Sequence, residues 1–201
     1  MTTENSVVQV LSIDEGLGVI CGGYIFTATH CLDVDYEGGI TLGQFRYQKC
    51  KTCDGEDFLA DLLFVDAVSD LAVLCCPDRQ SSFEQAEAYE RAIDGRGIAL
   101  FRGEVPSIDR EPMAVRIRNK HGWVEGSAIS TSNGRVFIDA PTQIFGGASG
   151  GPVITVTGDE LVAINSEYSE TGMACDGVAP WALQALPYWF AHHLLAENGT
   201  D

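Results

Sequence analysis

The sequence predicts an all-β protein whose strands form two antiparallel barrels or sandwiches. Its 201 residues contain many short runs of β-branched and aromatic side chains, separated by glycines and polar turn residues. No long helical pattern lies between consecutive runs, which disfavours a parallel sheet with crossover helices. Hydrophobic residues make up 45% of the chain and charged residues 20%, a composition typical of globular proteins.

The strand-like runs fall into two groups of six, which indicates two domains. The first group comprises Val7–Ile13, Gly18–Ile20, Tyr24–Ala28, Ile40–Phe45, Phe58–Val65 and Leu71–Cys75. The second comprises Gly97–Phe101, Met113–Arg118, Trp123–Ser130, Arg135–Ile138, Pro152–Val156 and Glu160–Asn165. We expect an N-terminal β-barrel at 1–80, a linker at 81–95, a C-terminal β-barrel at 96–180, and a terminal helix and tail at 181–201.

Two segments outside these runs are expected to be helical. The linker is rich in Glu and Ala, and Ser81–Glu84 forms a weak capping box, so one helical turn or more is expected there. From Trp181 to Ala196 the apolar residues recur at a spacing close to 3.6, which predicts an amphipathic terminal helix.

Charge and composition exclude several classes of partner. The formal net charge is −17, and a surface that binds nucleic acid needs clustered Lys and Arg instead. No apolar run reaches membrane-spanning length and the N-terminus lacks a basic region, so we expect a cytoplasmic protein that does not bind membranes. The cysteine count of seven is odd, and in a reducing compartment most should be free thiols. The sequence does not indicate an oligomeric state.

Three separate segments contain the residue types of nucleophilic catalysis. His30 ends one strand-like run, Asp70 opens another, and Ser149 lies in a glycine-rich turn. A serine hydroxyl needs a neighbouring base such as imidazole, and a carboxylate on the far ring nitrogen fixes the tautomer of that base. Asp61 and Asp66 lie near Asp70 and are the alternatives for the carboxylate. The glycines around Ser149 suit a tight turn whose backbone N–H groups point at one developing oxyanion.

The motifs TATHC, SDLAVL and GASGGPV, in this order, resemble those of the chymotrypsin-fold, trypsin-like serine peptidases. SDLAVL resembles in particular the bacterial HtrA-like (Deg) branch, here expected without a PDZ module. The resemblance spans about residues 21–180 and implies two six-stranded antiparallel β-barrels. It also implies a serine endopeptidase with Ser149 as nucleophile, His30 as general base and Asp70 as its orienting carboxylate. The amides of Gly147 and Ser149 would form the oxyanion hole.

The same resemblance implies a substrate site but no cofactor and no metal. Gln143 corresponds to the base of the primary specificity pocket, and Asn165, Ser166 and Glu167 correspond to its walls and to the strand that pairs with a protein or peptide substrate. Since Gln143 is uncharged, strict cleavage after Lys or Arg is not implied, although Glu167 adds a negative charge at the rim.

Position 148 departs from the secreted branch of the family. Secreted trypsins carry an aspartate there, which pairs with a freed N-terminal ammonium, and Ala148 offers no such charge. We therefore expect the intact chain to be competent without cleavage. The competing interpretation is a catalytically silent binding or scaffold protein with the same fold.

The cysteines leave two questions open. Cys21 and Cys31 resemble the disulfide that brackets the catalytic histidine in secreted relatives, whereas the expected compartment favours free thiols. Cys50 and Cys53 form a Cys-x-x-Cys between two strand-like runs, as in a turn, and together with Cys75–Cys76 they raise the alternative of a structural zinc site. Buried or turn cysteines are the simpler interpretation.

Overall fold

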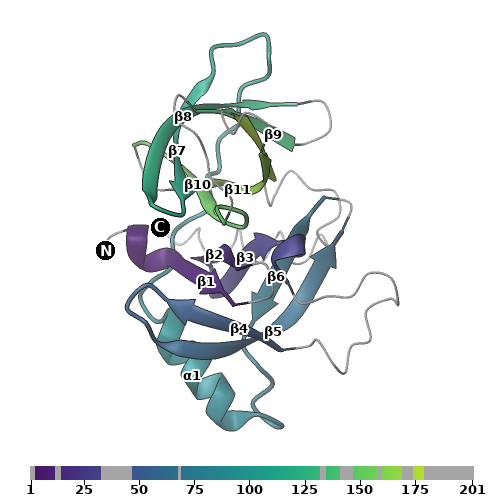
Figure 1. Cartoon of the computed structure of the whole chain (residues 1–201), viewed down its shortest axis with the longest axis vertical. Coiled ribbons are helices and arrows are strands. Elements are labelled where there is room, and N and C mark those ends of the chain that lie inside the picture. Colours follow the sequence, from purple (N-terminus) through teal and green to yellow (C-terminus); the bar gives the residue numbers. More distant parts are fainter. Residues whose placement is uncertain are drawn as a thin grey trace.

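Two closed six-stranded antiparallel barrels stand one above the other in the computed structural model (Figure 1). The structure describes residues 3–11, 15–32, 47–67, 69–131, 135–140, 147–157, 160–168 and 174–178. Closing each sheet on itself removes the unpaired strand edges that an open sheet would expose. The all-β double barrel expected from the sequence is therefore the observed fold.

The first barrel follows a short 3₁₀ turn at Thr3–Ser6. Its strands pair in the order β1-β2-β3-β6-β5-β4, and β4 closes the barrel against β1. Val8, Val10, Ile20, Ile25 and Leu74 fill its core. The strand bounds are β1 Val7–Val10, β2 Gly16–Cys21, β3 Tyr24–Ala28, β4 Tyr47–Thr52, β5 Asp57–Asp66 and β6 Leu71–Cys75.

The second barrel has the equivalent strand order, β10-β11-β12-β9-β8-β7, and β7 closes it against β10. Val115, Ile117, Ala128, Ile138 and Val153 lie buried inside it. The strand bounds are β7 Met113–Asn119, β8 Gly122–Ser130, β9 Arg135–Asp139, β10 Pro152–Thr155, β11 Leu161–Tyr168 and β12 Ala174–Val178.

The linker forms a helix of three turns, α1 Phe83–Ile93, which covers the lower end of the first barrel (Figure 1). Its buried residues, Ala86, Tyr89 and Ala92, recur every third position and so share one face. Tyr89 packs edge-on against Phe58 with ring centroids 5.8 Å apart, and its hydroxyl donates to the Gly23 carbonyl at 2.9 Å. The N-cap residue, Ser82, makes no side-chain capping bond, so packing on the barrel rather than a capping box stabilises this helix.

A separate apolar cluster lies between the barrels and joins them. Residues 97–101, expected to be a strand of the second barrel, run between the two sheets and make only isolated bridges, Cys21 with Ile98 and Leu100 with Leu161. The amide of Ile98 donates to the Ile20 carbonyl at 3.0 Å. Buried side chains from both barrels pack here: Val19, Cys21, Phe26, Leu71, Val73, Leu100, Leu161 and Ile164.

The sequence missed one strand in each barrel. In the first, β4 occupies Tyr47–Thr52, a segment with no expected strand, while the expected run Ile40–Phe45 lies outside the described residues. In the second, β12 takes the place expected for 97–101. The expected terminal helix at 181–201 also lies outside the described residues. None of the helices in the described ranges is long and apolar enough to cross a membrane.

Candidate active site

His30 and Asp70 meet because the strands that carry them are neighbours. Ala28 at the end of β3 pairs with Leu71 at the start of β6. His30 follows in a 3₁₀ turn (Thr29–Cys31), and Asp70 precedes β6, so both lie at the same edge of the barrel. Asp70 Oδ2 is 2.8 Å from His30 Nδ1, and the His30 backbone N–H donates to Asp70 Oδ1 at 3.0 Å. The carboxylate therefore holds both the ring and the backbone of His30.

Asp70 adopts a left-handed backbone conformation, with φ of 57°. Asp and Asn tolerate this region better than most non-glycine residues, because their short polar side chains bond locally. The amide of Thr29 donates to the Asp70 carbonyl at 3.2 Å, and the amide of His30 donates to the Asp70 side chain. These bonds hold an unfavourable backbone conformation at the point where the carboxylate must turn toward the imidazole.

Ser166 brings the second barrel into contact with Asp70. The register of β11 against β12 shifts between Asn165 and Glu167, so Ser166 is the extra residue of a β-bulge. A bulge re-aims the side chain that it carries. The Ser166 hydroxyl donates to Asp70 Oδ2 at 2.5 Å, across the boundary between the barrels. The carboxylate thus accepts three hydrogen bonds from groups of two barrels.

The electrostatics of this cluster favour charge on both partners. Asp70 raises the pKa of His30 above its ordinary value, chiefly through the hydrogen bond to the ring, and the Cys31 thiol contributes in the same direction. Burial acts to raise the pKa of the Asp70 carboxyl, but hydrogen bonds from the His30 ring, the Ser166 hydroxyl and the His30 amide together hold that pKa below its usual range. Asp70 therefore stays ionised at neutral pH and stabilises an imidazolium when one forms.

Ser149 lies in a tight turn wedged between the barrels. Its carbonyl accepts a hydrogen bond from the Leu17 amide at 2.8 Å, and its Oγ donates to the Ser166 carbonyl at 3.4 Å. Gly150 follows with φ of +77°, and a Cβ there would overlap the Leu17 carbonyl and the Thr27 hydroxyl. Glycine at 150 is therefore required by both conformation and space.

The peptide before Ser149 is anchored so that its N–H faces away from the protein interior. The Ala148 carbonyl accepts hydrogen bonds from the Gly151 amide at 2.9 Å and from Asn165 Nδ2 at 3.2 Å. In a trans peptide the C=O and N–H point in opposite directions. Because Asn165 and Gly151 hold the Ala148 carbonyl, the Ser149 N–H points in the opposite direction, away from Asn165. Gly147, with φ of +85°, completes the turn.

Residues 13–164 match the family model of the trypsin-like peptidase domain. The chain belongs to this family. Its trypsin-like fold is similar to that of the human pathogenic astrovirus serine protease (18% identity, 89% of this chain and 91% of that chain, TM-score 0.58). It is also similar to the inactive form of the Rv3671c protease of M. tuberculosis (16% identity, 98% of this chain and 91% of that chain, TM-score 0.60). A third similar structure is a Yersinia pestis serine endoprotease (22% identity, 88% of this chain and 59% of that chain, TM-score 0.61). No curated protein matches the chain significantly.

Of the four residues expected to bind substrate in a trypsin-like peptidase, the structure describes the side chains of two. The Asn165 side chain is buried beneath the Ser149 turn and holds the Ala148 carbonyl. Ser166 contacts Ser149 through its carbonyl and Asp70 through its hydroxyl. Glu167 pairs with β12 through its backbone, and its side chain lies outside the described residues, as does Gln143.

Of the three candidate carboxylates, the structure brings Asp70 to the imidazole of this peptidase. Asp66 instead accepts the Ser69 amide at 3.1 Å. Asp61 lies buried within β5, where it pairs with Tyr47 and Cys75 in the ladders. The contact of Ser166 with Asp70 was not foreseen, because residues 161–166 are all buried and offer no alternation that a bulge could interrupt.

Six cysteines of the trypsin-like domain are free thiols: Cys21, Cys31, Cys50, Cys53, Cys75 and Cys76. Cys21 and Cys31 form no disulfide, and a Cβ on Gly16 would overlap the Cys31 sulfur, so glycine there leaves room for the thiol. Cys50 was expected in a turn but lies buried within β4, whereas Cys53 is exposed in the turn that follows. In the described part of the chain no three His, Cys, Asp or Glu side chains gather as metal ligands would.

Proposed function

We propose that the chain is a serine endopeptidase in which Ser149 is the nucleophile, His30 the general base and Asp70 the carboxylate that orients it. The observation that carries this proposal is the 2.8 Å contact of His30 Nδ1 with Asp70 Oδ2, set beside a serine turn whose amide is directed outward. Binding at Nδ1 puts the ring proton there, so Nε2 of the neutral ring is left as an acceptor.

In the proposed reaction His30 takes the proton of Ser149 as the hydroxyl attacks the carbonyl carbon of the scissile bond. The amides of Gly147 and Ser149 donate to the developing oxyanion. His30 then protonates the leaving amine, and water attacks the acyl-enzyme by the same steps in reverse. Asp70 stabilises the imidazolium in each half of the cycle.

The hydroxyl of Ser149 donates to the Ser166 carbonyl in this structure, rather than to His30. A substrate strand pairing with β11 would offer its own N–H to that carbonyl and compete with the hydroxyl. We therefore expect substrate binding to release the hydroxyl toward the imidazole, since catalytic hydrogen bonds often tighten only in the complex.

Covalent labelling by a fluorophosphonate probe, combined with hydrolysis of a peptide library, tests this function. Wild-type protein should be labelled once per chain and cleave peptides, and Ser149→Ala should lose both by several powers of ten with an almost unchanged thermal midpoint. Ser81→Ala, an exposed serine before α1, is the matched control and should behave as wild type. Failure of the folded wild-type protein to be labelled would favour the silent binding or scaffold protein instead.

A further inference from the structure

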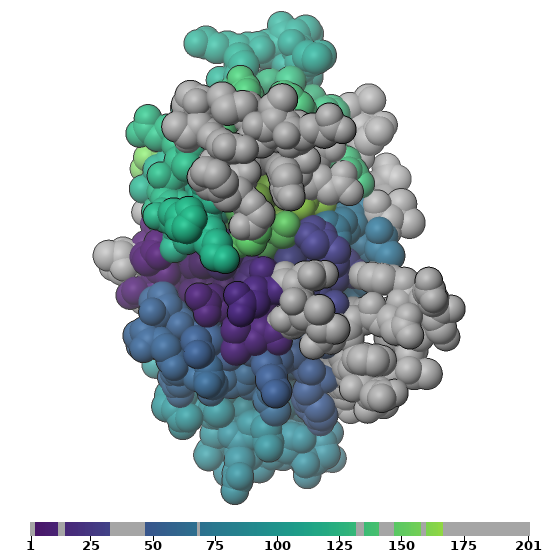
Figure 2. All heavy atoms as spheres, viewed as in Figure 1, coloured from purple at the N-terminus to yellow at the C-terminus, as the bar shows by residue number. Residues whose placement is uncertain are grey.

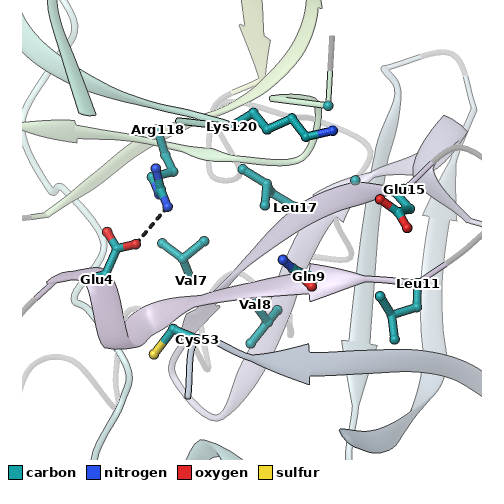
Figure 3. A pocket seen from close by; sticks show the side chains of 12 residues that line it. Glu4, Val7, Val8, Gln9, Leu11, Glu15, Leu17, Cys53, Arg118 and Lys120 are labelled. Carbon is teal, nitrogen blue, oxygen red and sulfur yellow. Dashed lines mark hydrogen bonds and ion pairs between the residues drawn. The ribbon is translucent and has the colours of Figure 1, made fainter. Parts of the chain in front are cut away.

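A cavity of about 180 Å³ lies between the two barrels beside the Ser149 turn (Figure 3). Gly147 is one of its lining residues, so the cavity borders a residue proposed for the oxyanion hole. Side chains of β1 and Leu17 come from the first barrel, and Arg118 and Lys120 come from the end of β7 and the turn after it. None of these flanking groups has a role in the reaction described above.

The position of the cavity relative to Ser149 indicates which half of a substrate it receives. Ser149 is held on one side by the Leu17 amide and on the other by the Ser166 carbonyl. The expected substrate-pairing strand, β11, contributes Ser166, whereas the cavity lies on the Leu17 side. A peptide that pairs with β11 up to the scissile bond must therefore continue past Gly147 into the cavity, where its leaving-group half would lie.

An ion pair neutralises the far end of the cavity. One carboxylate oxygen of Glu4 accepts from Arg118 at 2.7 Å, and the other accepts from Trp123 Nε1 at 2.9 Å. The Arg118 guanidinium also lies 6.0 Å from the centre of the Trp123 ring. These bonds hold the N-terminal segment against the second barrel, and Figure 2 shows that segment along the boundary between the barrels. The charge of Arg118 is thereby balanced before any ligand enters.

Lys120 borders the turn that carries the proposed oxyanion hole. Its Nζ lies 3.8 Å from the point where a Cβ on Gly147 would sit. The nearest atom of Glu15 to that point is its backbone carbonyl oxygen, at 3.9 Å, so the ammonium rather than the Glu15 carboxylate is the charge that borders the turn. Lys120 is exposed and forms no ion pair with any residue in the described ranges. An ammonium of this kind attracts a carboxylate.

We propose that this cavity binds the segment of the substrate that follows the scissile bond, and that Lys120 selects an acidic side chain at its first or second residue. The inference rests on the proposed endopeptidase function and adds a substrate class to it: peptides with Asp or Glu on the leaving-group side. The apolar floor, made by Val7 and Leu17, receives the aliphatic part of that side chain.

The test uses a peptide that wild-type protein cleaves, made in two forms with Asn or Asp at the first or second residue after the scissile bond. The ratio of kcat/KM for the acidic form over the neutral form should be about three to five, the range of a partly exposed ion pair. Lys120→Gln should bring the ratio close to one. Glu4→Gln should raise the ratio, because the amide oxygen can accept only one of the two hydrogen bonds and the Arg118 charge is left unbalanced. Arg110→Gln removes a cation from an exposed turn outside the cavity and should not change the ratio.

Opposite effects of two charge-altering variants separate recognition from general damage to the fold. The ratio should also fall as salt is raised, since partly exposed charges are screened. The inference is overturned if the wild-type ratio is one or less, or if Lys120→Gln leaves it unchanged while the neutral peptide is still cleaved. Failure of the proposed function is a different result, because then neither peptide is cleaved in a manner that depends on Ser149.

Discussion

Replacing Asp70 by Asn tests the geometry of the site more sharply than removing any other group. Asp70 Oδ1 accepts the His30 backbone N–H at 3.0 Å, and that donor is fixed, so the amide oxygen of the new Asn must take this place. The amide NH₂ then replaces Oδ2, which faces His30 Nδ1 at 2.8 Å. Because NH₂ is a donor, Nδ1 becomes the acceptor and the ring proton moves to Nε2. The neutral ring then cannot accept the serine proton.

The expected cost follows from this change of tautomer. Loss of the correctly oriented base in a serine-histidine-aspartate triad lowers kcat by about 10⁴, or about 5.5 kcal/mol of activation free energy. The acid limb of kcat/KM should also move. Since Asp70 raises the pKa of His30, the wild-type limb should lie above the ordinary imidazole value of about 6.5, and it should fall in the variant.

The assay is the pH profile of kcat/KM on a peptide that wild-type protein cleaves, with circular dichroism and thermal unfolding as folding controls. The matched carboxylate control is Glu56→Gln, which loses only the exposed ion pair of Glu56 with Arg91. This variant should retain wild-type activity. A folded Asp70→Asn protein with more than about a tenth of wild-type activity at pH 8 would refute the assigned role of Asp70. An acid limb at the same pH in both proteins would refute the electrostatic argument.

Two further substitutions probe the surroundings of Ser149 and Asp70. Gly150→Ala should destabilise the fold by about 3 kcal/mol in urea unfolding, because a φ of +77° is unfavourable for alanine and the new Cβ overlaps the first barrel. Gly23→Ala, with φ of +78° but open space around it, should cost only about 1 kcal/mol. Equal costs would contradict the packing argument. Ser166→Ala removes one hydrogen bond to the Asp70 carboxylate and should lower kcat about tenfold with little change in KM. An unchanged kcat would show that this bond does not position the carboxylate.

The sequence was informative wherever the signal is local. Alternating apolar residues located most strands of both barrels, and Tyr24–Ala28 and Leu71–Cys75 were predicted with their observed bounds. It failed at 97–101, where Leu100 is buried and Ile98 partly buried between the barrels rather than in a ladder, so the apolar run resembles a strand. It also missed Tyr47–Thr52, because two of its three buried residues, Gln48 and Thr52, are polar and leave no apolar alternation in the sequence.

The proposed chemistry of the site was predicted from residue types and glycine spacing, whereas its assembly depends on contacts between distant segments. His30, Asp70 and Ser149 could be named from three short motifs, because each motif encodes its own local turn. The bulge that turns Ser166 toward Asp70 arises from the register between β11 and β12, and the two residues are 96 positions apart. The cavity beside Gly147 exists only where the two closed barrels meet. Register and barrel contact are set by packing over the whole chain, and no local pattern of residues records them.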